Sequence, residues 1–86
     1  MRIRTSPLFR QRFKKLPKRI KERAARQEAL FRESPFDTRL GTHKLHGDKK
    51  DEWAWWIDYS YRVVFVFISS DEVLFMNVGT HDEVYR

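Results

Sequence analysis

Four side chains in the C-terminal half of this sequence could together cleave a phosphodiester bond. Arg62 opens the run YRVVFVF, His81 and Tyr85 lie in the segment VGTHDEVYR, and His43 lies in THKLHG. Cleavage needs a cation for the phosphate oxygens, a base for the attacking hydroxyl and an acid for the leaving oxygen. A guanidinium suits phosphate oxygens, an imidazole titrates near pH ~6.5, and a phenol can hydrogen-bond or stack on a base.

Each of these residues also has a structural interpretation. Arg62 could pair with a carboxylate such as Asp58, or lie on the solvent-facing side of a sheet. His81 could be a surface or capping residue after a strand, and His43 could pin its loop. The residue types alone leave both interpretations open.

The three histidines do not predict a metal site. His43 and His46 are three residues apart, and on an extended segment such a pair points to opposite faces. The chain has no cysteine, which excludes thiolate ligands. We therefore expect no metal and no cofactor, and Asp82 and Glu83 could instead orient His81 or repel a phosphate.

The N-terminal third predicts a short strand followed by two helices. RIRT is a candidate first strand, Ser6 and Pro7 are a helix start, and Phe9 and Phe13 follow at helical spacing. We expect helices over Pro7–Leu16 and from Lys18 to about Arg32, joined at Pro17 as an antiparallel hairpin.

The rest of the chain predicts three strands, over Trp53–Ile57, Tyr61–Ile68 and Val73–Val78, because aromatic and β-branched residues dominate there. The expected order is β-α-α-β-β-β in one domain of residues 1–86. This is an α+β fold, with an antiparallel meander carrying the helical hairpin on one face. The first strand is expected beside the last one, where it covers an exposed edge.

Three tryptophans crowd the first of these strands. Alternation puts Trp53 and Trp55 on one face, and core filling is the default for them in a chain of 86 residues. Trp56 has the opposite parity, so we expect it to be exposed or covered by a partner.

Positive charge is concentrated at the N-terminus. Residues 1–32 hold twelve Lys and Arg against two Glu, whereas the whole chain has a net charge of +6. This excess could attract a polyanion or an acidic partner, or it could be a solvated helix face. No apolar signal region or long apolar run is present, which argues against secretion or a membrane span and favours the cytoplasm.

The runs PFDTRLGTHKLHG, EWAWWIDYSYRVVFVF and VLFMNVGTHDEVY resemble the RelE/ParE superfamily of bacterial type II toxins, in its RelE/StbE-type and YafQ-like branch. The likeness extends over essentially the whole chain and is most specific in GTHDEVY. It implies the fold derived above. Many such toxins cleave mRNA, often on the ribosome, with the 2′-hydroxyl as nucleophile and no metal. An acidic cognate antitoxin holds each of them inactive.

The resemblance also implies roles for the four residues. Arg62 matches an arginine that contacts the scissile phosphate, and Tyr85 matches an aromatic residue that supports the substrate. His81 and His43 match histidines of the YafQ-like branch. We therefore predict an mRNA endoribonuclease whose catalytic residues are His81, Arg62, His43 and Tyr85.

The sequence departs from the family where RelE has two lysines, since Trp53 and Trp55 occupy those positions. A further histidine and aspartate of YafQ also lack counterparts, with Ile57 and Tyr61 near those places. These departures motivate a second hypothesis, a ParE-like gyrase inhibitor or a catalytically weak toxin that acts as an antitoxin-binding module. A third is a general nucleic-acid-binding domain.

Overall fold

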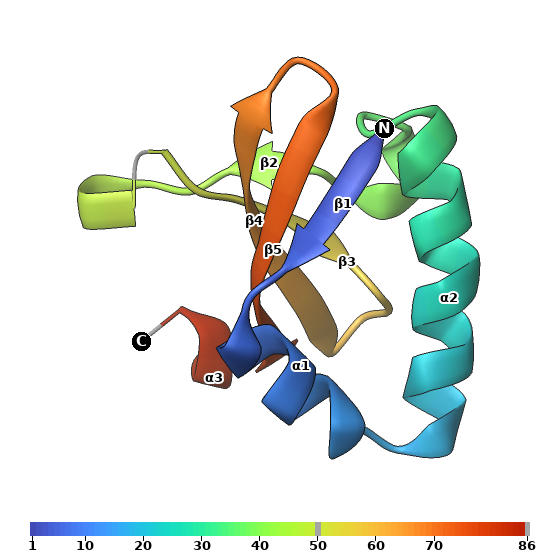
Figure 1. Ribbon diagram of the computed structural model, residues 1–86. Coiled ribbons are helices and arrows are strands. Elements are labelled where there is room, and N and C mark those ends of the chain that lie inside the picture. The colour runs from blue at the N-terminus through green and yellow to red at the C-terminus, as the bar shows by residue number, and fades with distance from the viewer. Residues whose placement is uncertain (50, 86) are drawn as a thin grey trace.

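The computed structural model, which describes residues 1–49 and 51–85, contains one five-stranded sheet with the strand order β1-β5-β4-β3-β2 (Figure 1). The strands are β1 (Arg2–Thr5), β2 (His43–Lys44), β3 (Trp53–Trp56), β4 (Tyr61–Ser69) and β5 (Glu72–Thr80). The helices are α1 (Pro7–Lys14), α2 (Lys18–Glu33) and α3 (His81–Val84), with short 3₁₀ turns η1 (Thr38–Leu40) and η2 (Gly47–Lys49).

The predicted α+β fold is confirmed, and two short elements are added to it. Strand β1 lies beside β5, as expected, and pairs with it in parallel, whereas the remaining neighbours are antiparallel. The additions are β2, with two residues, and α3, with four. Both carry residues singled out above, because β2 begins at His43 and α3 begins at His81.

Helix α1 begins as the sequence predicts. The Ser6 hydroxyl accepts a hydrogen bond from the Phe9 N–H at 3.0 Å, and Pro7 occupies the first helical position. The helix ends at Lys14, two residues earlier than expected, and a tighter turn to Leu16 leads into α2.

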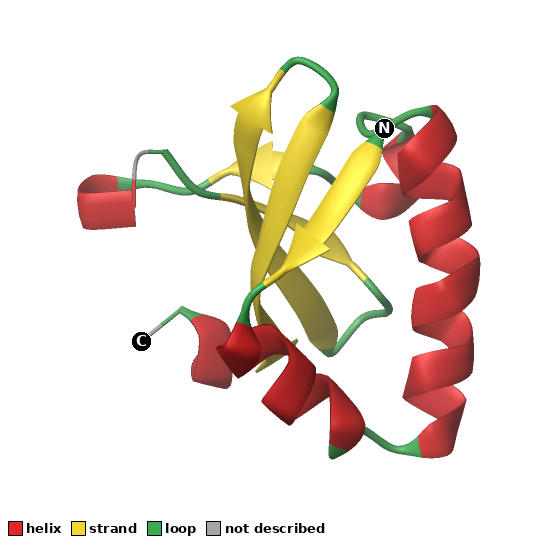
Figure 2. Ribbon diagram, viewed as in Figure 1, coloured by secondary structure: helices red, strands yellow, loops and turns green. Residues whose placement is uncertain are grey.

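Both long helices cover one face of the sheet, but they diverge from Pro17 instead of lying side by side as an antiparallel hairpin. Figure 2 shows α2 running along one side of the sheet while α1 lies across its lower end. Each helix buries its own apolar stripe against the strands. Phe9 of α1 packs on Phe75 with ring centroids 5.5 Å apart, and Phe31 of α2 packs on Phe65 at 5.1 Å.

The main core lies between these helices and the sheet. Phe31 and Trp55 are its centre, with exposed fractions of 0% and 1%, and Trp53 packs against its margin. Trp56 is 42% exposed. The parity argument for the three tryptophans is therefore confirmed.

The opposite face of the sheet carries a smaller apolar cluster, made of Leu45, Ala54, Val64 and Val84, with Tyr85 packed against it. No long helix covers this face in the part of the chain that the structure describes. Across residues 1–49 and 51–85, no helix is both long and apolar enough to cross a membrane.

Candidate functional site

The four predicted residues come together on the sheet face opposite α1 and α2, and we call them the four-residue cluster. Arg62 lies near the start of β4, between Trp56 on β3 and Gly79 on β5. The Tyr85 ring lies 4.5 Å from the His81 ring in an edge-to-face contact, and its hydroxyl lies 3.4 Å from His43 Nε2. Residues 42 positions apart in the sequence thus share one surface.

Helix α3 positions His81 and Tyr85, and a capping box fixes where it begins. Glu83 Oε1 accepts a hydrogen bond from the Thr80 N–H at 2.7 Å, and Thr80 Oγ1 accepts one from the Glu83 N–H at 3.4 Å. The hydrogen bond from the Thr80 N–H lowers the pKa of Glu83, because it favours the charged carboxylate. Glu83 is therefore a cap, and the T-x-x-E spacing of Thr80 and Glu83 was the sequence signal for it.

Asp82 has a different surrounding from Glu83. Its Oδ1 lies 3.6 Å from His81 Nδ1, and both side chains are exposed, at 86% and 62%. Asp82 is thus a neighbour of His81 whose interaction with the imidazole is screened by solvent.

The orientation of His43 is set by a backbone carbonyl. His43 Nδ1 lies 2.9 Å from the Gly41 oxygen, which can only accept, so Nδ1 carries the proton. In the neutral ring Nε2 is then the unprotonated nitrogen, and it faces the Tyr85 hydroxyl. Burial raises the pKa of Tyr85, and the charge of Arg62 partly opposes this rise, so the phenol stays protonated near neutrality.

Arg62 is held with little neutralisation of its charge. Its Nη2 donates a long hydrogen bond of 3.5 Å to the Tyr59 oxygen, and its Cζ lies 5.7 Å from the centre of the Trp56 ring. Its Nε is buried and has no hydrogen-bond partner among the described residues.

Asp58, the carboxylate considered as a partner for Arg62, has other partners. Asp58 Oδ1 accepts from the Ser60 and Tyr61 N–H groups at 2.8 Å each, and its Oδ2 lies 3.7 Å from Arg19. Within residues 1–49 and 51–85, no carboxylate lies within ion-pair distance of Arg62. The ion-pair interpretation of Arg62 with Asp58 is therefore wrong.

Two surface pockets adjoin the four-residue cluster. One, of about 420 Å³, is lined by Arg62 and His81 together with Tyr59 and Ser60. The other, of about 270 Å³, is lined by His43 and Tyr85. The contact between His81 and Tyr85 joins the two pockets, so an extended ligand could reach all four residues.

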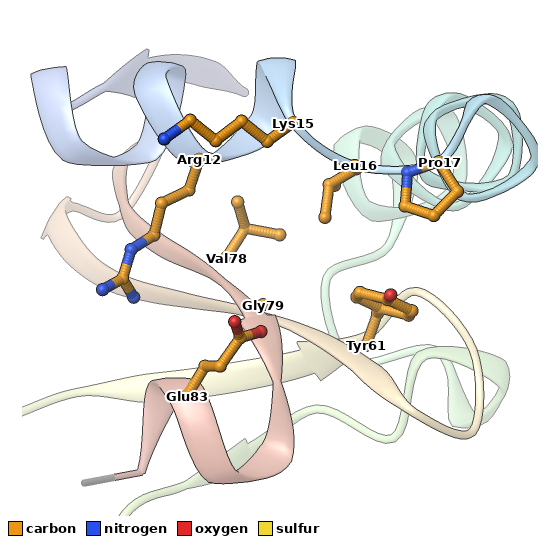
Figure 3. Close-up of a pocket in the computed structure, with 8 residues that line it drawn as sticks. All are labelled: Arg12, Lys15, Leu16, Pro17, Tyr61, Val78, Gly79 and Glu83. Carbon is orange, nitrogen blue, oxygen red and sulfur yellow. The ribbon is translucent and has the colours of Figure 1, made fainter.

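A third pocket lies between α1 and α3 and contains none of the four residues (Figure 3). Arg12 of α1, Lys15 just after α1, Tyr61 of β4 and Glu83 of α3 line this pocket, which has a volume of about 290 Å³. Figure 3 shows the Arg12 and Glu83 side chains on the same side of this pocket. Arg12 is engaged there, because it donates to Asn77 Oδ1 at 2.9 Å.

The positions that depart from the family lie away from the four-residue cluster. Trp53 and Trp55 face the helix-covered side, Ile57 is fully buried, and Tyr61 packs against the main core. On β3, the residues that share a face with Arg62 are Ala54 and Trp56. Among the described residues, no group of three or more His, Asp or Glu is arranged to hold a metal ion.

No family model and no curated protein matches the sequence, but solved structures match it over most or all of its length. YafQ from E. coli superposes with a TM-score of 0.81, at 18% identity, over 100% of both chains. A YoeB/ParE toxin from Agrobacterium tumefaciens gives 0.78 at 16% identity, over 94% of this chain and 99% of its own.

The chain has the RelE/ParE toxin fold. RelE in the archaeal RelE–RelB complex from Pyrococcus horikoshii extends this likeness, with a TM-score of 0.71 and 17% identity over 92% of each chain. The fold resemblance read from the sequence is thus confirmed by structures that share fewer than one residue in five with it.

Proposed function

We propose that this RelE/ParE-fold chain is the toxin of a type II toxin–antitoxin system and that it cleaves mRNA without a metal ion. One observation carries the proposal. The four-residue cluster gathers one cation, two imidazoles and a phenol on a sheet face that no long helix among residues 1–49 and 51–85 covers. These are the groups that cleavage through a 2′-hydroxyl requires.

In the proposed reaction, the 2′-oxygen attacks the neighbouring phosphorus and the bond to the 5′-oxygen breaks, which leaves a 2′,3′-cyclic phosphate. His81 is exposed beside Arg62 and takes the proton of the 2′-hydroxyl. Arg62 stabilises the charge that builds on the phosphate oxygens.

The leaving 5′-oxygen needs a proton, and His43 supplies it through Tyr85. Protonated His43 donates from both ring nitrogens, to the Gly41 oxygen and to the Tyr85 oxygen. The Tyr85 hydroxyl then passes its own proton to the 5′-oxygen and regains one from His43. A neutral base and a charged acid together predict a bell-shaped dependence of the rate on pH.

The decisive experiment expresses the chain without a partner and maps new 5′-hydroxyl ends in cellular mRNA. We expect His81→Ala to lower cleavage by about 10²–10⁴, the usual cost of a lost proton-transfer group. Lys18→Ala, an exposed cation on α2, is the matched control and should cleave like the wild type. An absence of new ends in the wild type, or an unchanged pattern in His81→Ala, would refute the mechanism.

The proposed partner is an acidic cognate antitoxin. Similar folds occur in the E. coli DinJ–YafQ toxin–antitoxin complex and in the RelE–RelB complex. The excess of ten positive charges in residues 1–32 supports such a partner. We place the activity in the cytoplasm, and comparing free with translated mRNA tests whether the ribosome takes part.

The ParE-like alternative is tested with the same purified protein. Inhibition of gyrase supercoiling combined with intact mRNA would replace the nuclease with a gyrase inhibitor. Cleaved mRNA with unaffected gyrase supports the nuclease.

A further inference from the structure

Trp56 is the large side chain next to the four-residue cluster that the proposed reaction does not use. It is the last residue of β3 and lies directly opposite Arg62 on β4. The Arg62 guanidinium carbon lies over the indole, 5.7 Å from the ring centre. This distance is within the range in which an aromatic face attracts a cation.

Gly41 packs closely against the indole ring of Trp56. The backbone of Gly41 has φ +58°, and a Cβ placed on it would lie 2.4 Å from two carbon atoms of the Trp56 ring. Only a glycine combines this left-handed backbone with so close an approach. Gln27 Nε2 also donates to the Trp56 oxygen at 2.9 Å, so both the ring and the backbone of Trp56 are fixed.

An aromatic face orients a guanidinium in a way that a carboxylate cannot. A carboxylate would neutralise the positive charge and compete with an incoming phosphate, whereas an indole leaves the charge available. The surroundings of Arg62 match the second case. Its Nε is buried without a partner, and no carboxylate among the described residues pairs with it.

We propose that Trp56, supported by Gly41, is a positioning residue that holds the Arg62 guanidinium toward the pocket shared with His81. Arg62 and Trp56 together then form a subsite for one phosphodiester of a single-stranded RNA. The identity of this ligand rests on the proposed function. The subsite itself rests on the contacts of Trp56 with Arg62 and Gly41.

The test compares Trp56→Leu, Trp56→Phe and Arg62→Ala in two assays. The first measures kcat and KM on a short RNA. The second measures the Kd of the same RNA with a 2′-deoxy sugar at the cleavage position, which binds but cannot react.

We expect Trp56→Leu to lower kcat by about ten- to a hundredfold, because a misdirected cation loses transition-state stabilisation. It should also weaken binding of the deoxy-substituted RNA severalfold, while Trp56→Phe restores most of both losses. The midpoint of urea unfolding should change little, because Trp56 is 42% exposed. A general structural role would lower this midpoint without such a rescue by phenylalanine.

Two outcomes separate failure of this inference from failure of the proposed function. If Trp56→Leu keeps kcat and Kd within twofold of the wild type while Arg62→Ala loses both, Trp56 does not position Arg62 and the nuclease stands. If the wild type cleaves no RNA, the Kd values decide alone. A Kd that rises in both the Arg62 and the Trp56 variants supports the subsite, and a Kd that is unchanged in these variants overturns it.

A measurement on the wild type covers the case in which Trp56→Leu fails to fold. The Arg62 Nε–H and Trp56 indole N–H signals in ¹⁵N NMR should shift together as the deoxy-substituted RNA is added. Titration to saturation without movement of either signal would overturn the subsite.

Discussion

Tyr85 touches two histidines, with its ring against His81 and its hydroxyl toward His43. A stacking role needs only the ring, whereas a proton relay needs the hydroxyl. A phenylalanine at this position, which lacks only the hydroxyl oxygen, therefore separates the two roles of Tyr85.

Tyr85→Phe is expected to lower the rate of RNA cleavage by about 10², because it removes the relay and keeps the ring. The alkaline limb of the pH profile of kcat should change with it, because that limb reports loss of the proton from the general acid, and His43 then has no route to the substrate. Single-turnover rates between pH 5 and 9 would measure both effects. A variant with the wild-type rate and profile would mean that Tyr85 only stacks.

Sequence reasoning found the four residues because their types fit a reaction and because each matches a position in the family that the sequence resembles. It could not give their partners. The contact of Asp58 with Arg19 joins residues 39 positions apart. The packing of Trp56 against Gly41 depends on the left-handed backbone conformation of Gly41. Neither leaves a local pattern in the sequence.

At the scale of elements, α3 depends on its capping box. The helix has only four residues, too few to be stable by themselves, so the bonds between Thr80 and Glu83 decide whether it forms. His81 is the first residue of this helix and Tyr85 is its C-cap, so loss of the helix would separate both residues from Arg62.

Thr80→Ala is expected to destabilise the protein by about 1 kcal/mol, the usual cost of removing an N-cap. The rate of RNA cleavage should fall by more than this loss of stability explains, because His81 is displaced when the helix does not form. Urea unfolding and hydrogen exchange of the α3 amides would measure the change. Thr80→Ser keeps the capping oxygen and serves as the control, and equal effects of the two variants would contradict the capping explanation.

The turn η1 predicts a pH dependence of stability. Asp37 Oδ1 accepts a hydrogen bond from the Arg39 N–H at 2.9 Å, and the Arg39 side chain binds the same carboxylate. These hydrogen bonds lower the pKa of Asp37 from 3.8 to about 2. The stability they contribute is complete above pH ~4 and is lost as the pH falls toward 2, since the folded state binds the proton less readily.

We expect Asp37→Asn to flatten the dependence of unfolding free energy on pH between 4 and 2, as measured by urea titrations at several pH values. Glu33→Gln, at the exposed end of α2, is the control and should leave this slope in place. An unchanged slope in Asp37→Asn would show that other carboxylates carry it.

The long elements were predictable because apolar residues repeat in them with a clear period. Helix α2 and strands β3 to β5 agree with their predicted ranges to within a few residues. Strand β2 has two residues and helix α3 has four, too few for a periodic pattern to repeat. The divergence of α1 from α2 depends on packing against the sheet. Such features are settled by tertiary contacts.

The whole molecule depends on one aromatic core. Phe31 is fully buried and lies within 5.7 Å, between ring centroids, of Trp55, Phe65 and Phe75. It is thus the contact through which α2 binds three strands at once.

Phe31→Ala is expected to cost about 3–5 kcal/mol. A domain of this size has roughly 4–13 kcal/mol in total, so much of the protein would unfold. Phe36→Ala is the matched control, because Phe36 is 57% exposed and should cost far less. Calorimetry or urea unfolding would compare the two, and similar losses would show that α2 is not the main support of the sheet.

The parallel pairing of β1 with β5 has a consequence for synthesis of the protein. Arg2 pairs with Glu72, so the sheet cannot close until the ribosome has released residues made long after β1. His81 and Tyr85 follow later still. A nascent chain therefore lacks the proposed nuclease site until the ribosome has made and released the segment that contains His81 and Tyr85.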